Sequence, residues 1–132
     1  MNKEDNLKEK FKQALISTVK VISDDLEIKK DKNSNSKNYN FFEVENLKST
    51  KDFVKLRAET DSEALKIKFS NKNIYQKNLP GKSSCKTLYN ISEKIRYEML
   101  GSKMLNGVSK NLKENYINKI SFKDIESIKS KN

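Results

Sequence analysis

The sequence contains no histidine and only one cysteine, Cys85. Without histidine, neither a Ser-His-Asp triad nor a metal cage of cysteine and histidine can be built. A single cysteine also excludes a disulfide bond within the chain. We therefore expect no catalytic residues, no cofactor site and no metal site in this chain.

Long hydrophobic runs are missing as well. No stretch approaches the roughly 18 apolar residues of a membrane span. The N-terminal sequence MNKEDNLKEK has no apolar run behind its charges, so it does not resemble a secretory signal. We expect a cytoplasmic protein without a membrane contact. The 132 residues suit one domain, and a hydrophobic content of 34% favours a folded chain with a lean core.

The formal net charge is +10, from 28 Lys and Arg against 18 Asp and Glu. Lysine neutralises phosphate, so one interpretation is a small basic helical nucleic-acid-binding protein. The other is compositional, because the whole chain is rich in Lys, Asn and Ile. Base recognition favours arginine, yet Arg57 and Arg96 are the only arginines, and the lysines are interleaved with acids. We therefore favour the compositional explanation and keep nucleic-acid binding as the alternative.

Apolar residues at helical spacing predict a mainly α fold. A first helix is expected over residues 6–25. A second begins near Ser49-Thr50, because a hydroxyl cap precedes Asp52 in the first turn. A short helix then ends before Pro80.

The segment between the first two helices is less regular. Residues 30–40 are rich in Asn and Ser and predict a polar loop. Residues 26–28 and 41–44 on either side of it could pair as a short β-hairpin.

The third helix begins after Gly81 and carries two apolar stripes rotated from each other by more than a quarter turn. The first stripe comprises Leu88, Ser92, Ile95 and Met99, and the second Gly101, Leu105, Val108, Leu112 and Tyr116. A helix with two stripes must be covered on two sides. It is therefore either a long central helix or one that breaks near Gly101. Residues 118–132 are expected to form an amphipathic tail.

The sequence LPGKSS at residues 79–84 ends like a phosphate-binding loop. Such a loop needs a glycine five residues before Gly81, where this chain has Gln76, and it should follow a buried strand. Pro80 also occupies the position where the backbone would wrap the phosphate. We therefore predict a turn, with Ser83 or Ser84 as the cap of the third helix.

The two arginines suggest a need for a planar, forked donor. Arg57 projects on the same helix side as Ala64, so we expect it to be buried and paired with Asp61 or Glu98. Arg96 lies one turn from Glu93. The structural interpretation is a clamp between the second and third helices, and the functional alternative is an anion or partner site.

The segment SEKIRYEMLGSKMLNGVSKNL resembles the N-terminal region of the T subunit of aerobic cobaltochelatase, the CobT-type protein of cobalamin biosynthesis. The residues that carry this resemblance are Glu93, Arg96, Glu98, Gly101, Met104, Gly107, Val108, Asn111 and Leu112. RAETDSEAL adds Arg57, Asp61, Ser62, Ala64 and Leu65, and Pro80 falls where a proline is expected. The resemblance spans roughly residues 11–116. Ser70, Asn71 and Tyr75 depart from it, since histidine or acidic residues are expected there.

The resemblance implies a role in a three-component enzyme. That complex inserts cobalt into hydrogenobyrinic acid a,c-diamide, using ATP and magnesium. A large subunit binds the corrin, an AAA+ subunit hydrolyses ATP, and the T subunit assembles with the ATPase. The family's acidic linker and adhesion-site domain have no counterpart in this sequence, so we expect the N-terminal domain alone.

The resemblance also marks candidate residues for structural or partner contacts. They are Arg57, Asp61, Arg96, Glu98, Gly101, Met104, Gly107 and Asn111. Glycine costs about 1 kcal/mol in a helix relative to alanine, so a close helix contact should offset that cost. We expect this contact inside the domain for Gly101 and with an outside partner for Gly107.

Overall fold

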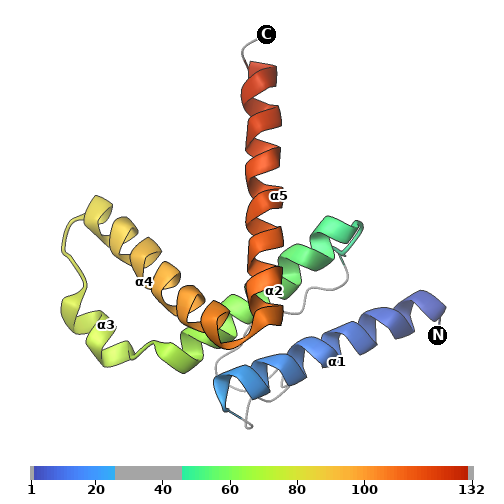
Figure 1. Cartoon of the computed structure of the whole chain (residues 1–132), viewed down its shortest axis with the longest axis horizontal. Coiled ribbons are helices and arrows are strands. Elements are labelled where there is room, and N and C mark those ends of the chain that lie inside the picture. Colours follow the sequence, from blue (N-terminus) through green and yellow to red (C-terminus); the bar gives the residue numbers. More distant parts are fainter. Residues whose placement is uncertain (1, 26–45, 131–132) are drawn as a thin grey trace.

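The computed structural model describes residues 2–25 and 46–130, apart from the side chains of residues 122, 124, 125 and 127. Every regular element in this part of the chain is helical, so the mainly α class is confirmed. The helices are α1 (Lys3–Ser23), α2 (Thr50–Phe69), α3 (Lys72–Asn78), α4 (Ser83–Met104) and α5 (Asn106–Ser130) (Figure 1). The expected polar loop 30–40 and the hairpin formed by 26–28 and 41–44 lie outside the described residues.

Helix α2 occupies the centre of the fold, because α1, α4 and α5 all pack against it. In Figure 1, α1 lies below α2, whereas α4 and α5 diverge upward from it like the two arms of a V. The short α3 connects the end of α2 to the start of α4. The C-terminal half of α5 extends away from the other helices. The fold therefore combines a core around α2 with two diverging arms.

Among the described residues, the hydrophobic core is small and is built on α2. Its buried apolar side chains are Leu15, Val19 and Ile22 from α1, Ala58, Ala64 and Leu65 from α2, Tyr97 from α4, and Val108 and Leu112 from α5. Three of these nine come from α2 itself, which contacts neighbours on several sides. Near the start of α2, the rings of Phe11 and Phe53 meet edge to face with 5.1 Å between centroids.

The start of α2 agrees with the sequence prediction. Ser49 and Asp52 form a reciprocal capping box, in which each side chain accepts a hydrogen bond from the other residue's backbone N–H. The start of α4 differs, because its N-cap is Lys82, which makes no capping bond through its side chain. The prediction of Ser83 or Ser84 as the cap is therefore wrong: both are already helical.

The chain breaks between α4 and α5 at Leu105, whose backbone is extended (φ -133°, ψ 108°). Of the two alternatives for the third predicted helix, the broken one is therefore observed. Gly101 is not the break, since it lies inside α4 and is buried. Beyond Leu105, α5 continues to Ser130. Residues 118–130 of the expected amphipathic tail therefore form the second half of α5.

Candidate interaction surface

At Gly101, α4 packs directly against α2. A β-carbon at this position would lie within 2.8 Å of Cγ of Leu65, and closer still to its two methyl carbons. Leu65 is fully buried, so it has little room to move away. Gly101 thus permits the close approach of α4 to α2, which is the contact within the domain that the sequence suggested.

Glu98 is a buried carboxylate on α4 that joins three helices. Its Oε1 accepts a hydrogen bond from Ser62 of α2, and its Oε2 accepts one from the hydroxyl of Tyr116 of α5 at 2.6 Å. Lys94, one turn earlier on α4, places its ammonium 3.8 Å from Oε1. Burial and the bond to this carboxylate raise the pKa of the Tyr116 hydroxyl well above its usual range. Glu98 therefore fixes the base of the V.

Asp61 and Asn111 form a second buried link, between α2 and α5. Nδ2 of Asn111 donates to Oδ2 of Asp61 at 2.7 Å, and Asp61 is only 1% exposed. Burial raises the pKa of Asp61, while the bond from Asn111 and the charge of Arg57 act in the opposite direction. Asn111 thus compensates part of the cost of burying this carboxyl group.

Arg57 was expected to be buried, and this prediction is wrong, because Arg57 is exposed. Arg57 does lie on the helix side that carries Ala64, two turns later. That side of α2 is buried at Ala64 and exposed at Arg57, and the long arginine side chain can reach solvent. Its effect on Asp61 is a Coulomb attraction that lowers the pKa of that carboxyl group.

Arg96 forms a clamp between the end of α2 and the middle of α4. Its Nη2 donates to the backbone carbonyl of Phe69 and to Oε1 of Glu93, both at 2.7 Å. Ser70 donates its hydroxyl to the same Glu93 oxygen at 2.7 Å. The bonds from Arg96 and Ser70 lower the pKa of Glu93 to about 2. The clamp therefore satisfies a C-terminal carbonyl of α2 and ties α2 to α4.

Met104 and Gly107 lie beside the break and are exposed. A β-carbon at Gly107 would meet no atom within 4 Å, so no contact among the described residues explains this glycine. The prediction of an outside contact at Gly107 stays a prediction.

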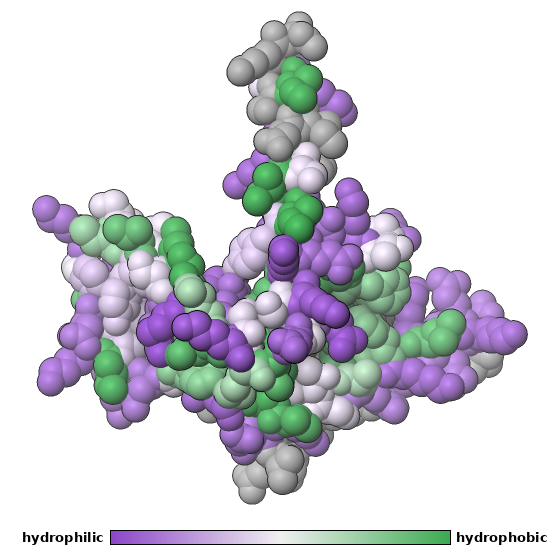
Figure 2. Space-filling view, in the orientation of Figure 1, coloured by the Kyte–Doolittle hydropathy of each residue, from purple (hydrophilic) through white to green (hydrophobic). Residues whose placement is uncertain are grey.

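The first apolar stripe of α4 faces solvent. Its apolar members Leu88, Ile95 and Met99 are 66%, 51% and 56% exposed, and Ser92 is exposed too. Ile91, which borders the predicted stripe, is 51% exposed. The expectation that this stripe is covered inside the domain is therefore wrong. The break at Leu105 lies within the second stripe, and burial falls on that stripe, where Gly101, Val108 and Leu112 are buried. Figure 2 shows hydrophobic residues at the surface of both arms, including the sides that face each other.

Helix α5 continues this apolar area across the V. A groove of about 290 Å³ lies where the arms meet, with Ile95 and Met99 on one wall and Leu112 and Tyr116 on the other. Ile120, one turn after Tyr116 on the same face, is 60% exposed. We call these exposed apolar residues the α4–α5 surface; they are Leu88, Ile91, Ile95, Met99, Tyr116 and Ile120.

Lysines border the α5 side of this surface. A hollow of about 590 Å³ between the start of α2 and α5 is lined by Lys51, Lys55, Lys119 and Lys123, around Tyr116 and Ile120. Two acids, Asp52 and Glu126, also line it. The carboxylate of Asp52 is already engaged by the backbone N–H groups of Lys48 and Ser49, which lower its pKa. The border is therefore predominantly positive.

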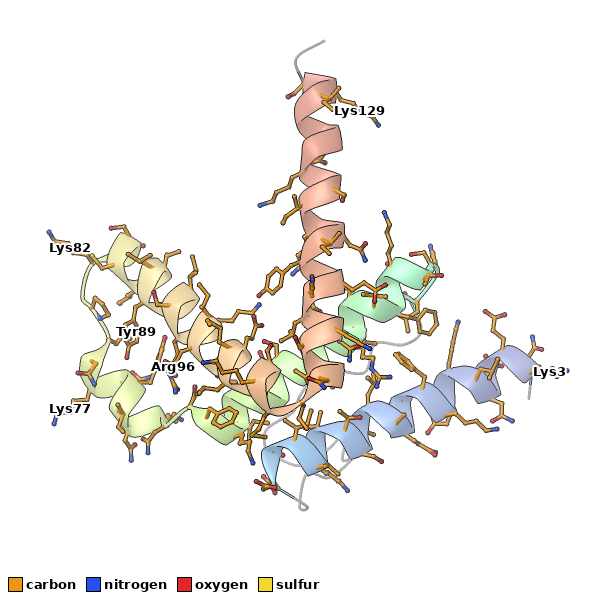
Figure 3. All side chains as sticks on the ribbon, viewed as in Figure 1. Lys3, Lys77, Lys82, Tyr89, Arg96 and Lys129 are labelled. Atoms are coloured by element: carbon orange, nitrogen blue, oxygen red, sulfur yellow. The ribbon has the colours of Figure 1, made fainter. Side chains whose placement is uncertain are left out.

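A larger pocket of about 700 Å³ lies between the end of α2, α3 and α4, and its lining is mixed in charge. Lys66, Lys72 and Lys94 line it together with Glu63 and Glu93. Within the part of the chain that the structure describes, no group of three acidic or cysteine side chains could hold a metal ion. Figure 3 shows Arg96 and Tyr89 of α4 on the side toward α3, where the Tyr89 ring contacts the Tyr75 ring at 5.2 Å between centroids, whereas Lys82 points outward.

Of the residues that the sequence singled out, Asp61, Glu98, Gly101 and Asn111 make contacts within the domain, whereas the α4–α5 surface was not among the expectations. The signal that could have located it is the rotation between the two apolar stripes. A rotation of more than a quarter turn within one predicted helix indicates two helices that pack separately. It does not indicate which element, if any, packs against the first stripe.

A family model described as cobalamin biosynthesis protein CobT matches residues 5–132. No curated protein and no solved structure matches the chain. Among the described residues, no helix is long and apolar enough to cross a membrane.

Proposed function

The chain belongs to the CobT family of cobalamin biosynthesis proteins, and we propose that it is a non-catalytic assembly module of the ATP-dependent aerobic cobaltochelatase. In this role it binds the AAA+ ATPase subunit and the large corrin-binding subunit. Cobalt, the metal substrate, is inserted into hydrogenobyrinic acid a,c-diamide by the other subunits. The pathway follows from the family, and the assembly role is the proposed step.

The observation that carries this proposal is the α4–α5 surface. Its four residues on α4 are all more than half exposed and lie within one stripe of about 80° at 100° per residue. A contiguous apolar face of this kind marks an interaction site, whereas isolated exposed hydrophobic residues are ordinary. The charged and polar groups of the same helix, Glu93, Arg96 and Glu98, are used for contacts within the domain.

The proposal also assigns nucleotide and metal chemistry to other subunits. Gln76, five residues before Gly81 of the GKS segment, lies in α3 and not in a glycine loop after a strand. The chain has no histidine. Calorimetric titration of the chain with ATP and magnesium should show no saturable heat, and micromolar binding of either would contradict this assignment.

Nucleic-acid binding is the rival function, and the lysines around the α5 hollow are the observation in its favour. Phosphate binding would explain these lysines, but it leaves the apolar stripe on α4 without a role. The two functions differ in salt dependence, since phosphate contacts weaken steeply with added salt.

Reconstitution of the chelatase tests the assembly role. A T subunit with Ile91→Ser and Ile95→Ser should assemble poorly with the ATPase subunit and should insert cobalt slowly. Val21→Ser is the matched control, because Val21 is 71% exposed on α1, away from the stripe. Normal assembly and full cobalt insertion by a T subunit that lacks this domain would show that the proposal is wrong.

A further inference from the structure

We propose that the α4–α5 surface binds one amphipathic α-helix of a partner subunit, with its apolar side on the α4 stripe and acidic side chains toward α5. This inference rests on the proposed assembly function and specifies the structure and charge of the partner.

The α4 side of the surface favours a helix as the occupant. Leu88, Ile91, Ile95 and Met99 follow each other at three- and four-residue steps over about 16 Å at 1.5 Å per residue. Apolar anchors at these steps are the pattern by which helices bind helices. An extended peptide on the same stripe would leave its backbone N–H and C=O groups without partners, whereas a helix satisfies its own.

The divergence of the two arms provides the space. α4 and α5 contact each other at the base of the V and separate beyond it (Figure 1). The groove at the base is lined by Ile95, Met99, Leu112 and Tyr116, so a helix that lies along α4 would enter this groove at one end. Such an occupant contacts both arms, as a third helix does in a bundle.

Charge distinguishes an acidic partner from a second copy of the chain. Lys113 lies at the groove, and Lys51, Lys55, Lys119 and Lys123 border the α5 side. The carboxylate at the groove, Glu98, is buried and hydrogen-bonded within the domain. A second copy would bring these lysines together in a chain whose net charge is already +10. Acidic side chains complement them.

Cys85 provides a position for a probe. It is the only cysteine of the chain, it is exposed, and it lies one helical turn before Leu88. A fluorophore attached there through a maleimide reports binding on the α4 arm. The full chain labelled at Cys85 is titrated with the purified ATPase subunit. It is also titrated with an 18-residue helical peptide that has leucines at i, i+3, i+4 and i+7 and glutamates beside them.

Two variants test the surface, each against a matched control. Ile95→Ser should weaken binding of both the subunit and the peptide by at least about tenfold, as loss of a central anchor does. Val21→Ser should leave both unchanged. Lys119→Gln with Lys123→Gln should weaken peptide binding about threefold or more and reduce its salt dependence. Lys3→Gln with Lys10→Gln on α1 is the control for total charge.

Each other outcome contradicts a defined part of the inference. If the ATPase subunit binds and Ile95→Ser weakens it but the peptide does not bind, the assembly function stands and the acidic helix is wrong. If the subunit binds equally well to Ile95→Ser, the surface itself is wrong. A dimer of the chain that Ile95→Ser abolishes would identify a second copy as the occupant. Binding of a 20-nucleotide single strand that survives Ile95→Ser, without peptide binding, would favour the nucleic-acid alternative.

Discussion

The base of the V and its arms have opposite chemistry. At the base, where α2, α4 and α5 meet, the buried groups include the carboxyl groups of Asp61 and Glu98. Along the α4 arm, which faces solvent, the exposed groups include Ile91 and Ile95. The base therefore buries carboxyl groups beside its apolar core, whereas the arm exposes apolar groups, and neither arrangement follows from hydrophobic burial alone. The base uses specific hydrogen bonds to fix the helices, and this arrangement leaves an apolar face available for binding.

The largest expected loss of stability comes from a substitution at the base of the V. Asn111→Leu removes the amide that donates to Asp61 and leaves a buried carboxyl group without that partner. We expect a loss of about 3 kcal/mol in the free energy of unfolding, measured by urea denaturation. Adding Asp61→Leu to the same chain should restore most of it, because two apolar side chains need no hydrogen bond. No recovery in the double variant would mean that Asn111 acts by another contact.

The two helical glycines, Gly101 and Gly107, provide an internal control for helix packing. Gly101→Ala places a β-carbon against Leu65 and should cost about 1–3 kcal/mol through overpacking. Gly107→Ala meets no atom within 4 Å and should instead stabilise the domain by about 0.4–1 kcal/mol. Thermal melts of the two variants should shift in opposite directions. A shift in the same direction would contradict the close approach of α4 to α2 at Gly101.

Two carboxyl groups should affect acid stability in opposite directions. The pKa of Glu93 falls from 4.5 to about 2 in the folded chain, so its contribution is complete above pH 4.5 and is lost as pH falls toward 2. The pKa of Asp61 is raised by burial, so acidification favours the folded state at that site.

Melting temperatures between pH 5 and 2.5 test this difference. Glu93→Gln should flatten the loss of stability on acidification, and Asp61→Asn should steepen it. Equal slopes in both variants and the unchanged chain would show that neither group has a shifted pKa.

The smallest change in stability is expected for substitutions on the α4 arm. Ile91→Ser with Ile95→Ser should change the free energy of unfolding by less than about 0.5 kcal/mol per site, since both side chains are half exposed. The measurement is again urea denaturation, with Val21→Ser as the control. A loss of several kcal/mol would mean that another part of the chain covers the stripe.

Local sequence signals located the helices because their causes are local. Ser49 and Asp52 are three residues apart and form the capping box that their types predict. The end of α3 before Pro80 was expected for a similar reason, because the helical conformation is disfavoured for the residue that precedes a proline.

The packing of side chains depends on residues far apart in the sequence. Asn111 was a candidate, but its partner Asp61 is 50 positions away and no spacing rule joins them. Periodicity placed Arg57 on the side of Ala64, and it could not show where the covering helix ends. Periodicity also identified the α4 stripe as an apolar face. Such a pattern cannot say whether the element that packs against this face belongs to the same chain or to a partner.

Gly101 and Glu98 fix α4 near its C-terminal end, so a small tilt there produces a larger displacement at its N-terminal end. Leu88 lies 13 residues from Gly101, or about 20 Å along the axis at 1.5 Å per residue. A tilt of roughly 5° at the base therefore moves the outer end of the stripe by roughly 2 Å, which is enough to separate apolar atoms that were in contact. Ser62 lies beneath this surface and donates to the Glu98 carboxylate, so a buried side chain helps to set the width of the opening into which a partner fits.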